Sequence, residues 1–427
     1  MLTSLFTAVS GMDANGESLS VIGDNIANEN TIGFKSSVVT FGDVLSQSMS
    51  GGSGTSQIGR GVEMTSVSPV FTQGSFQTSS NGLDLAIDGN GFFMVNDPGT
   101  NARSYTRAGQ FSLDKNGNVV NPDGLTLQGY LADATGNITG TIGDLTVAAV
   151  QNPAVATTTA NVTANVDSSD AAAAAWTFVG GTTTPPSSSQ YNSTTTVTVY
   201  DSQGGAHPVN VFFAKTANNA WTAHYVYTDS TGVYREAATT QNLTFNTSGA
   251  LAADNDAPTT FVWGGGVANG AITFDYGTSI AEGGTGLDGT TQYNSPFSIL
   301  NLTQNGYAAG ALKNIQVGQD GTITGVFTNG QTRAVGQVAL ANFIAPTQLT
   351  KLGRNLYAES FQSGQPVIGA PNTSGLGKID SNSLELSNVD LASEFVKMIA
   401  AQRGFEANSK VITTSDALLQ TLTNLSI

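Results

Sequence analysis

Two histidines, His207 and His224, are the side chains in this sequence best suited to act as general bases near neutral pH. A histidine base needs a nucleophile and an orienting carboxylate within hydrogen-bond reach, and no serine, aspartate or second histidine stands in a pattern that supplies them. The chain contains no cysteine, which excludes a thiolate nucleophile and a thiolate zinc site. We therefore expect no catalytic residue and a structural role for both histidines.

Two loops imitate cofactor or metal sites. The glycines of segment 284–289 match the spacing of a dinucleotide-binding loop, but no strand–turn–helix pattern surrounds them. Segment 114–125 begins like a calcium loop, yet Val119 stands where the loop requires glycine and Leu125 where it requires glutamate. A tight hairpin turn explains the second pattern without a metal. The sequence therefore predicts no cofactor and no metal site.

The charge of the chain limits its partners. Of the 427 residues, 15 are Lys or Arg and 31 are Asp or Glu, and the basic residues are scattered. Nucleic-acid binding requires clustered basic side chains, so we expect no nucleic-acid partner. No continuous apolar stretch approaches the roughly 18 residues of a membrane span, and the first basic residue, Lys35, comes too late for a secretory signal. We expect no membrane insertion and no cleaved signal peptide.

The two ends of the chain share a sevenfold apolar repeat. A short helix with such a stripe cannot bury it alone, so each end must pack against the other end or against another copy of the chain. The spacing by itself leaves both possibilities open. The stripe residues are Leu5, Val9, Met12, Leu19 and Ile26 near the start, and Leu391, Phe395, Met398, Phe405, Ile412 and Leu419 near the finish.

The elements that must position these stripes are helices, predicted at 2–27 and 389–424, the second preceded by a capping box at 387–390. Between the helices the apolar period changes to two. Asn-Gly and Asp-Gly turns there separate segments rich in Thr, Ile and Val, which is typical of antiparallel strands. A shift to Ala and Thr near residue 148 marks the start of an inserted domain.

These patterns predict a multidomain fold. Terminal α-helices form a coiled-coil-like inner domain, and mainly antiparallel β domains lie outside it, the outermost inserted into the inner one. The expected parts are a helical domain of 1–30 with 387–427, an irregular connector of 31–75, an inner β domain of 76–147 with 287–373, an inserted outer β domain of 148–286, and a linker of 374–386.

The residues around both stripes resemble the signatures of a known family, the flagellar rod and hook axial proteins. Segment 25–35 (NIANENTIGFK) is similar to the end of that family's N-terminal helix, and segments 387–403 and 407–415 are similar to its C-terminal signature. Segments 89–95, 105–111 and 124–130 resemble its shared β domain. The positions that carry the terminal signatures are Asn25, Asn28, Gly33, Phe34, Asn388, Asp390, Gln402, Arg403 and Asn408.

The resemblance implies a structural subunit of the bacterial flagellum, exported through the type III apparatus, and not an enzyme. Rod members are typically shorter and lack a large insert, so the insert favours the hook, a curved tube that transmits torque from rod to filament as a universal joint. The implied partners are further copies of the chain, rod and hook–filament junction proteins, the hook cap and the export apparatus. Two alternatives remain open: a distal rod-type protein forming a straight shaft, and a β-rich surface adhesin, which would not explain the terminal repeats.

Overall fold

The computed structural model describes residues 2–45, 59–133, 135–147 and 151–425. The chain divides into two compact units, which we describe separately. Unit 1 consists of Met1–Ala149, Lys313–Val326 and Thr332–Ile427, and unit 2 consists of Val150–Leu312 and Phe327–Gln331. The prediction of terminal helices with mainly antiparallel β structure between them is confirmed.

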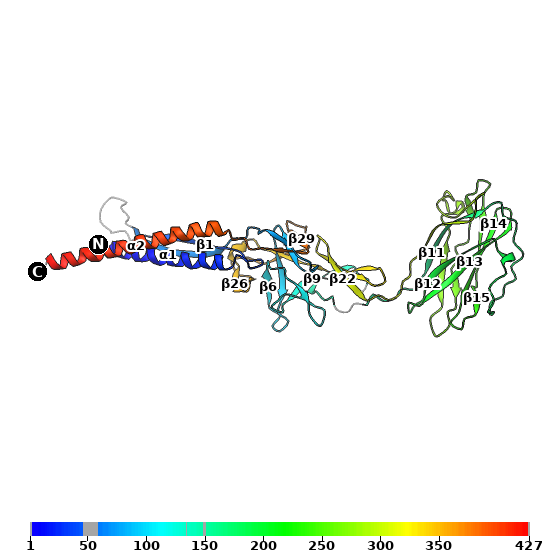
Figure 1. The fold of residues 1–427 in the computed structure, drawn as a ribbon, viewed down its shortest axis with the longest axis horizontal. Helices are drawn as coiled ribbons and strands as arrows, with labels where there is room; N and C mark the ends of the chain where they lie inside the picture. The colour runs from blue at the N-terminus through cyan, green and yellow to red at the C-terminus, as the bar shows by residue number, and fades with distance from the viewer. Residues whose placement is uncertain (1, 46–58, 134, 148–150, 426–427) are drawn as a thin grey trace. The chain divides into compact units, whose positions relative to one another are not determined.

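Two long helices, α1 and α2, lie side by side in unit 1 (Figure 1). Helix α1 spans Leu2–Ala27, as the apolar period predicts, and α2 spans Leu391–Leu425. Helix α2 begins two residues later than expected because Asp390 is its N-cap: the Asp390 Oδ1 accepts the backbone N–H of Ala392 at 2.9 Å. Within the part of the chain that the structure describes, no helix is long and apolar enough to cross a membrane.

The connector between α1 and the β region is not irregular, contrary to expectation. Strands β1 (Ser37–Leu45) and β2 (Gly59–Pro69) pair antiparallel beside the helices. The apolar residues of β1, such as Val38, Val39 and Phe41, do not alternate regularly, and register shifts interrupt the pairing with β2, so a period of two does not reveal these strands. The Gly/Ser-rich segment between the two strands lies outside the described residues.

The β part of unit 1 is one large, mostly antiparallel sheet with two small strand pairs beside it. Its core includes Phe92, Tyr105, Phe343 and Tyr357, whose rings meet edge to face. The large sheet contains β5 (Phe92–Asn96), β6 (Arg103–Thr106), β7 (Ser112–Leu113), β8 (Val119–Val120), β9 (Thr126–Ala132), β10 (Ile138–Asp144), β22 (Leu312–Val317), β23 (Thr322–Phe327), β24 (Thr332–Val338), β25 (Leu340–Asn342), β26 (Thr350–Gly353), β27 (Leu356–Ala358) and β28 (Val367–Gly369). The pairs are β3 (Phe76–Thr78) with β30 (Ser383–Glu385), and β4 (Leu85–Asp88) with β29 (Lys378–Ser381).

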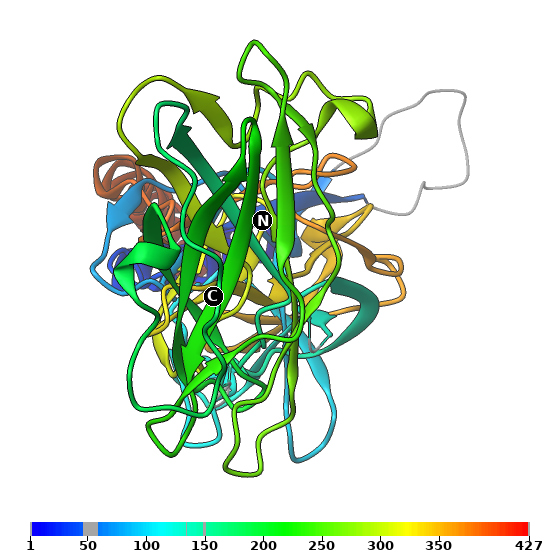
Figure 2. The same ribbon diagram turned by 90° about the vertical axis from the view of Figure 1, so that its right-hand side faces the viewer.

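Unit 2 packs two sheets around a separate core, and Figure 2 shows its long strands in green. Strand β11 is the exception to antiparallel pairing, because it pairs parallel to β19 and β20. One sheet contains β12 (Ser193–Tyr200), β13 (Ala206–Ala217), β14 (Ala220–Thr228), β15 (Tyr234–Glu236), β16 (Gln241–Phe245) and β17 (Leu251–Ala253), and the other contains β11 (Thr159–Asp167), β18 (Thr259–Phe261), β19 (Gly270–Asp275), β20 (Thr291–Tyr293) and β21 (Ser298–Gln304). Residues 287–312, which the sequence groups with the inner β domain, lie in unit 2, since β20 and β21 pair with β11.

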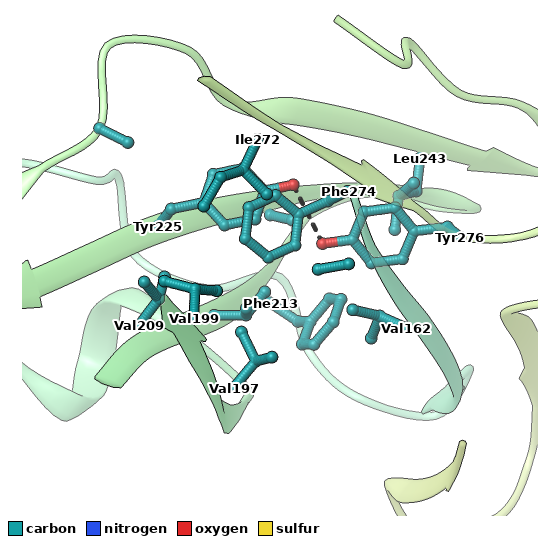
Figure 3. Close-up of a cluster of buried hydrophobic side chains, with 14 of the residues drawn as sticks. Val162, Val197, Val199, Val209, Phe213, Tyr225, Leu243, Ile272, Phe274 and Tyr276 are labelled. Atoms are coloured by element: carbon teal, nitrogen blue, oxygen red, sulfur yellow. Dashed lines mark hydrogen bonds between the residues drawn. The ribbon is translucent and has the colours of Figure 1, made fainter. Parts of the chain in front are cut away.

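Inward-facing side chains from both sheets form the core of unit 2 (Figure 3). Val197 and Val199 of β12 and Phe213 of β13 are buried, as the alternation along these strands predicts. The one polar contact drawn in this cluster joins the hydroxyls of Tyr225 and Tyr276 at 3.1 Å, so that these buried oxygens have a partner.

Candidate assembly surface on the terminal helices

Helices α1 and α2 approach each other closely through small and polar residues. A Cβ added to Gly11 would lie 2.7 Å from Nδ2 of Asn408, and a Cβ added to Gly404 would lie 2.8 Å from Oδ1 of Asn15. Residue numbers therefore rise along α1 while they fall along α2, so the two helices are antiparallel. Gly404, which lowers helix propensity, is explained by this close approach.

The buried residues of the helix pair are also small or polar. Among the residues whose exposure the structure describes, they are Ala8, Gly11, Ala14, Ile22 and Asn25 on α1, and Glu394, Ala401 and Ser415 on α2. Ile22 is the one large apolar side chain among them. Other large apolar side chains of the two helices stay exposed, among them Phe6 at 66% and Val396 at 67%.

The stripe residues predicted from the sevenfold repeat are not buried in the single chain. Phe395 is 49% exposed, Phe405 39% and Val9 38%. The remaining stripe residues are intermediate in exposure: Leu5, Met12, Leu19, Ile26, Leu391, Met398, Ile412 and Leu419. The helix pair thus leaves the stripes partly exposed. Completing the burial of Phe395, Phe405 or Val9 in another molecule would contribute about 1 kcal/mol each, a part of the value for a fully exposed side chain.

Strands β1 and β2 extend this apolar surface. Val38, Phe41, Met64 and Val67 are each more than a third exposed. A cleft of about 370 Å³ lies between the two helices and β1, with Ile22 among the residues that line it. This part of unit 1 therefore carries far more exposed apolar surface than scattered single residues would provide.

Asn25 joins the three elements of this region. It is buried, and its side-chain amide donates to the Ser37 carbonyl at 2.9 Å and to Glu394 Oε2 at 3.1 Å, while its Oδ1 accepts the Ser37 N–H at 2.8 Å. Three residues further on, Asn28 donates to the Asp24 carbonyl at 2.9 Å and so closes the last turn of α1.

Gly33 and Asn388 fix the chain where the helices meet the β region. Gly33 has φ +69°, and a Cβ there would lie 2.5 Å from the backbone nitrogen of Ala108, so both conformation and space require glycine. The side chain of Asn388 accepts the Ser36 N–H at 2.7 Å and donates to the Val70 carbonyl at 2.8 Å.

The other signature residues lie apart from one another and make different contacts. Phe34 is buried under the Lys351 ammonium, whose nitrogen lies 5.7 Å from the ring centroid. Asp390 caps α2, and Asn408 meets Gly11 in the helix contact. Gln402 and Arg403 are exposed, and no contact within the single chain explains why these residue types stand at these positions.

A buried charge cluster, which the sequence did not single out, lies beside these contacts. The Lys35 ammonium lies 2.6 Å from Glu385 Oε1, and Arg107 Nη1 lies 3.5 Å from Glu385 Oε2. Lys35 also donates to the Thr72 carbonyl at 2.8 Å. Burial lowers the pKa of the Lys35 ammonium, and the Glu385 carboxylate opposes that shift. Lys35 and Arg107 fall inside the quoted family segments, but no local pattern marks Glu385 as their partner.

Both histidines lie on strands of unit 2, each between a carboxylate and an indole. His207 Nε2 is 2.7 Å from Asp201 Oδ2, and its ring stacks on Trp263 at 4.2 Å. His224 Nδ1 is 3.0 Å from Glu236 Oε1, and its ring stacks on Trp176 at 3.8 Å. These contacts hold loops against the sheet, which is a structural role.

Three carboxylates of unit 2 also gather, a cluster that sequence spacing does not reveal. One oxygen each of Asp254, Asp256 and Glu282 lies within 4.8 Å of the others. Desolvation of the carboxylate by its neighbours, followed by the charge of Asp254, raises the pKa of Asp256 to about 7, although the residue as a whole is exposed. Acidic groups on a surface commonly gather without a ligand.

The helix pair with its partly exposed stripes and the β units with their own cores are the features of a structural subunit. Four family models of flagellar proteins match successive parts of the chain. The flagella basal body rod protein matches residues 5–35, and the flagellar hook protein FlgE/F/G D1 domain matches residues 86–166. The flagellar basal body protein FlaE D2 domain matches residues 161–307, and the flagellar basal body rod FlgEFG protein C-terminal region matches residues 380–425.

Over its whole length, this chain is similar to flagellar hook proteins. The chain is 38% identical over 425 residues to the flagellar hook protein FlgE of Escherichia coli K12, covering 98% of each chain. It is 37% identical to that of Salmonella typhimurium LT2, covering 99% of this chain and 100% of the relative, and 35% identical to that of Borreliella burgdorferi over all of both chains. A crystal structure of Helicobacter pylori flagellar hook protein FlgE2 has a related fold, with a TM-score of 0.52 and 14% identity over 72% of this chain and 100% of that one. The chain belongs to the flagellar hook protein FlgE family, a structural family of the flagellum.

Proposed function

We propose that this hook-family subunit polymerises into a curved, flexible tube, which acts as a universal joint and transmits torque from rod to filament. The observation that carries the proposal is the row of apolar side chains on α1 and α2 that the single chain leaves at its surface. Neighbouring copies would bury these side chains, and many such contacts would stabilise the polymer. The helices would form a coiled-coil-like inner tube.

The outer parts would follow the division of the chain. The β part of unit 1 would surround the helical domain, and unit 2 would be the outermost domain, inserted between the two halves of unit 1. The connector 31–75, with its β1–β2 hairpin, and the linker 374–386 would set the position of the β part on the helices. Rod and hook–filament junction proteins, the hook cap and the type III export apparatus are the proposed partners, supported by the whole-length similarity to hook proteins.

A flexible joint requires neighbouring subunits to slide past one another. Only 11% of the residues are charged, whereas soluble domains usually have about 25%. Surfaces of Thr, Ser and Asn can exchange contacts at lower desolvation cost than buried ion pairs. This composition supports a bending tube over a stiff shaft.

The stripe is tested by Phe405→Asp in the purified full-length protein. The change would bury an unpaired charge between copies, which is strongly unfavourable, so we expect no tubes by electron microscopy at concentrations where the unchanged protein forms them. Phe405→Leu keeps the site apolar and is expected to assemble. Because Phe405 is 39% exposed in the single chain, the helical circular dichroism of the monomer should stay the same. Normal tubes from Phe405→Asp would rule out a role for the stripe.

A further inference from the structure

The two helices carry opposite charges on the sides that face away from their mutual contact. Asp13 and Glu17 of α1 are exposed. With about 3.6 residues per turn, both lie on the side of α1 opposite Gly11 and Asn15, which contact α2. Helix α1 contains no Lys or Arg, so this acidic row has no basic partner on its own helix.

A basic row occupies the matching side of α2. Arg403 and Lys410 are exposed and seven residues apart, and both lie roughly 100–160° around α2 from Gly404 and Asn408, which contact α1, so they occupy an outer flank of α2. Glu406 lies between them, so the row keeps one net positive charge. Within the described residues, the one ion pair formed on the helices joins Lys397 to Glu394 at 2.6 Å and leaves both rows unpaired.

The two rows also stand at the same level of the helix pair. Gly404 lies against Asn15, so Arg403 on the outer flank of α2 is level with Asp13 and Glu17 on the outer side of α1. The helix pair therefore has an acidic edge and a basic edge. Two different complementary edges suit a heterologous contact, in which one edge of each copy meets the other edge of the next, and such contacts build rings or helical polymers.

We propose that Asp13 and Glu17 of one copy pair with Arg403 and Lys410 of the neighbouring copy, and that these pairs set the lateral register of the helices in the polymer. This inference rests on the proposed function and adds the partner surface and its register. It accounts for the exposure of Arg403, a signature residue with no role in the single chain. Apolar stripes supply association without fixing register, whereas like charges brought together by a wrong register are repelled.

Charge reversal in two separate variants tests this pairing. The acid-edge variant is Asp13→Lys with Glu17→Lys, and the basic-edge variant is Arg403→Glu with Lys410→Glu. Each alone brings like charges together at every lateral contact, so we expect its critical concentration for assembly to rise at least about tenfold. A one-to-one mixture restores opposite charges at each contact between unlike copies and is expected to form tubes that contain both variants.

The mixture distinguishes pairing between copies from pairing within a copy. If Asp13 or Glu17 instead paired with Arg60 of the same chain, mixing would not restore assembly. Lys115→Glu with Lys313→Glu is a matched control, because both lysines are exposed on the β part and the change in net charge equals that of the basic-edge variant. It is expected to assemble normally.

Assembly of each edge variant alone at the wild-type concentration would overturn the inference, as would a mixture of folded variants that forms no tubes. Helical circular dichroism of each monomer establishes folding. If the unchanged protein forms no tubes, the proposed function itself fails, and the two failures are therefore distinguishable.

Discussion

The Asp256 carboxyl group is the clearest titrating group of unit 2 near neutral pH. Its pKa is raised to about 7 by desolvation of the carboxylate among its neighbours and by the Asp254 charge. The folded protein therefore holds a proton that the unfolded chain releases near the ordinary pKa of about 3.9. The resulting stability is present at low pH and is lost as pH rises through about 7.

We expect the thermal midpoint of unit 2 to be lower at about pH 8 than at about pH 5, and Asp256→Asn to reduce that difference. Tryptophan fluorescence measures this unit alone, because all three tryptophans, Trp176, Trp221 and Trp263, lie in it. Asp229→Asn is a control for which the opposite pH dependence of stability is expected. Bonds from Thr231 and Arg235 lower the pKa of Asp229, so its ionised form stabilises the fold at neutral pH, and its loss should lower the midpoint at about pH 8. Identical pH profiles for wild type and Asp256→Asn would contradict the raised pKa.

At the scale of elements, the Lys35–Glu385–Arg107 cluster joins the segment after α1 to strand β30 and to the loop after β6. Lys35 and Glu385 are separated by 350 residues and are fully buried. Removing the shared carboxylate would leave two buried cations without an anion. Such a loss commonly destabilises a protein by about 3–5 kcal/mol.

Glu385→Ala is therefore expected to lower the free energy of unfolding of unit 1 by about 3–5 kcal/mol. Urea denaturation followed by helical circular dichroism measures it, because α1 and α2 both belong to unit 1. Lys378→Ala is the control: Lys378 pairs with Asp88 at 3.2 Å but is 38% exposed, and such pairs contribute less than about 1 kcal/mol. Equal effects of the two changes would show that the cluster does not hold these segments together.

The sequence predicted the elements better than the contacts between them. The sevenfold repeat located both helices, and turns such as Asn116-Gly117 indicated the hairpins, because these signals depend on neighbouring residues. The β1–β2 hairpin was missed, since the apolar residues of its strands do not alternate regularly. The Glu385 cluster could not be predicted, because its members come together only in the folded chain.

The candidate surface was predicted in part. The stripe residues were named correctly as positions on helices, but whether the partner helix buries them depends on which side of each helix faces the other. That side is set by Gly11, Asn15, Gly404 and Asn408, small and polar residues that hydropathy does not weight. The opposite charges of the two edges likewise become visible only when the contact face is known.

At the scale of the whole molecule, the single chain is an incomplete structure. Its β units have their own cores, but its helices expose large apolar side chains such as Phe395. If neighbouring copies bury these side chains, as proposed, folding and assembly of the helical part are coupled, and polymerisation would stabilise that part by mass action.

Electron cryo-microscopy of the polymer formed by the purified full-length protein tests the central claim most directly. The account predicts a tube whose inner wall contains α1 and α2, with Leu19, Phe395 and Phe405 buried between copies and Arg403 beside Glu17 of a neighbour. A polymer held together by the β units alone, with these side chains still exposed to solvent, would contradict it.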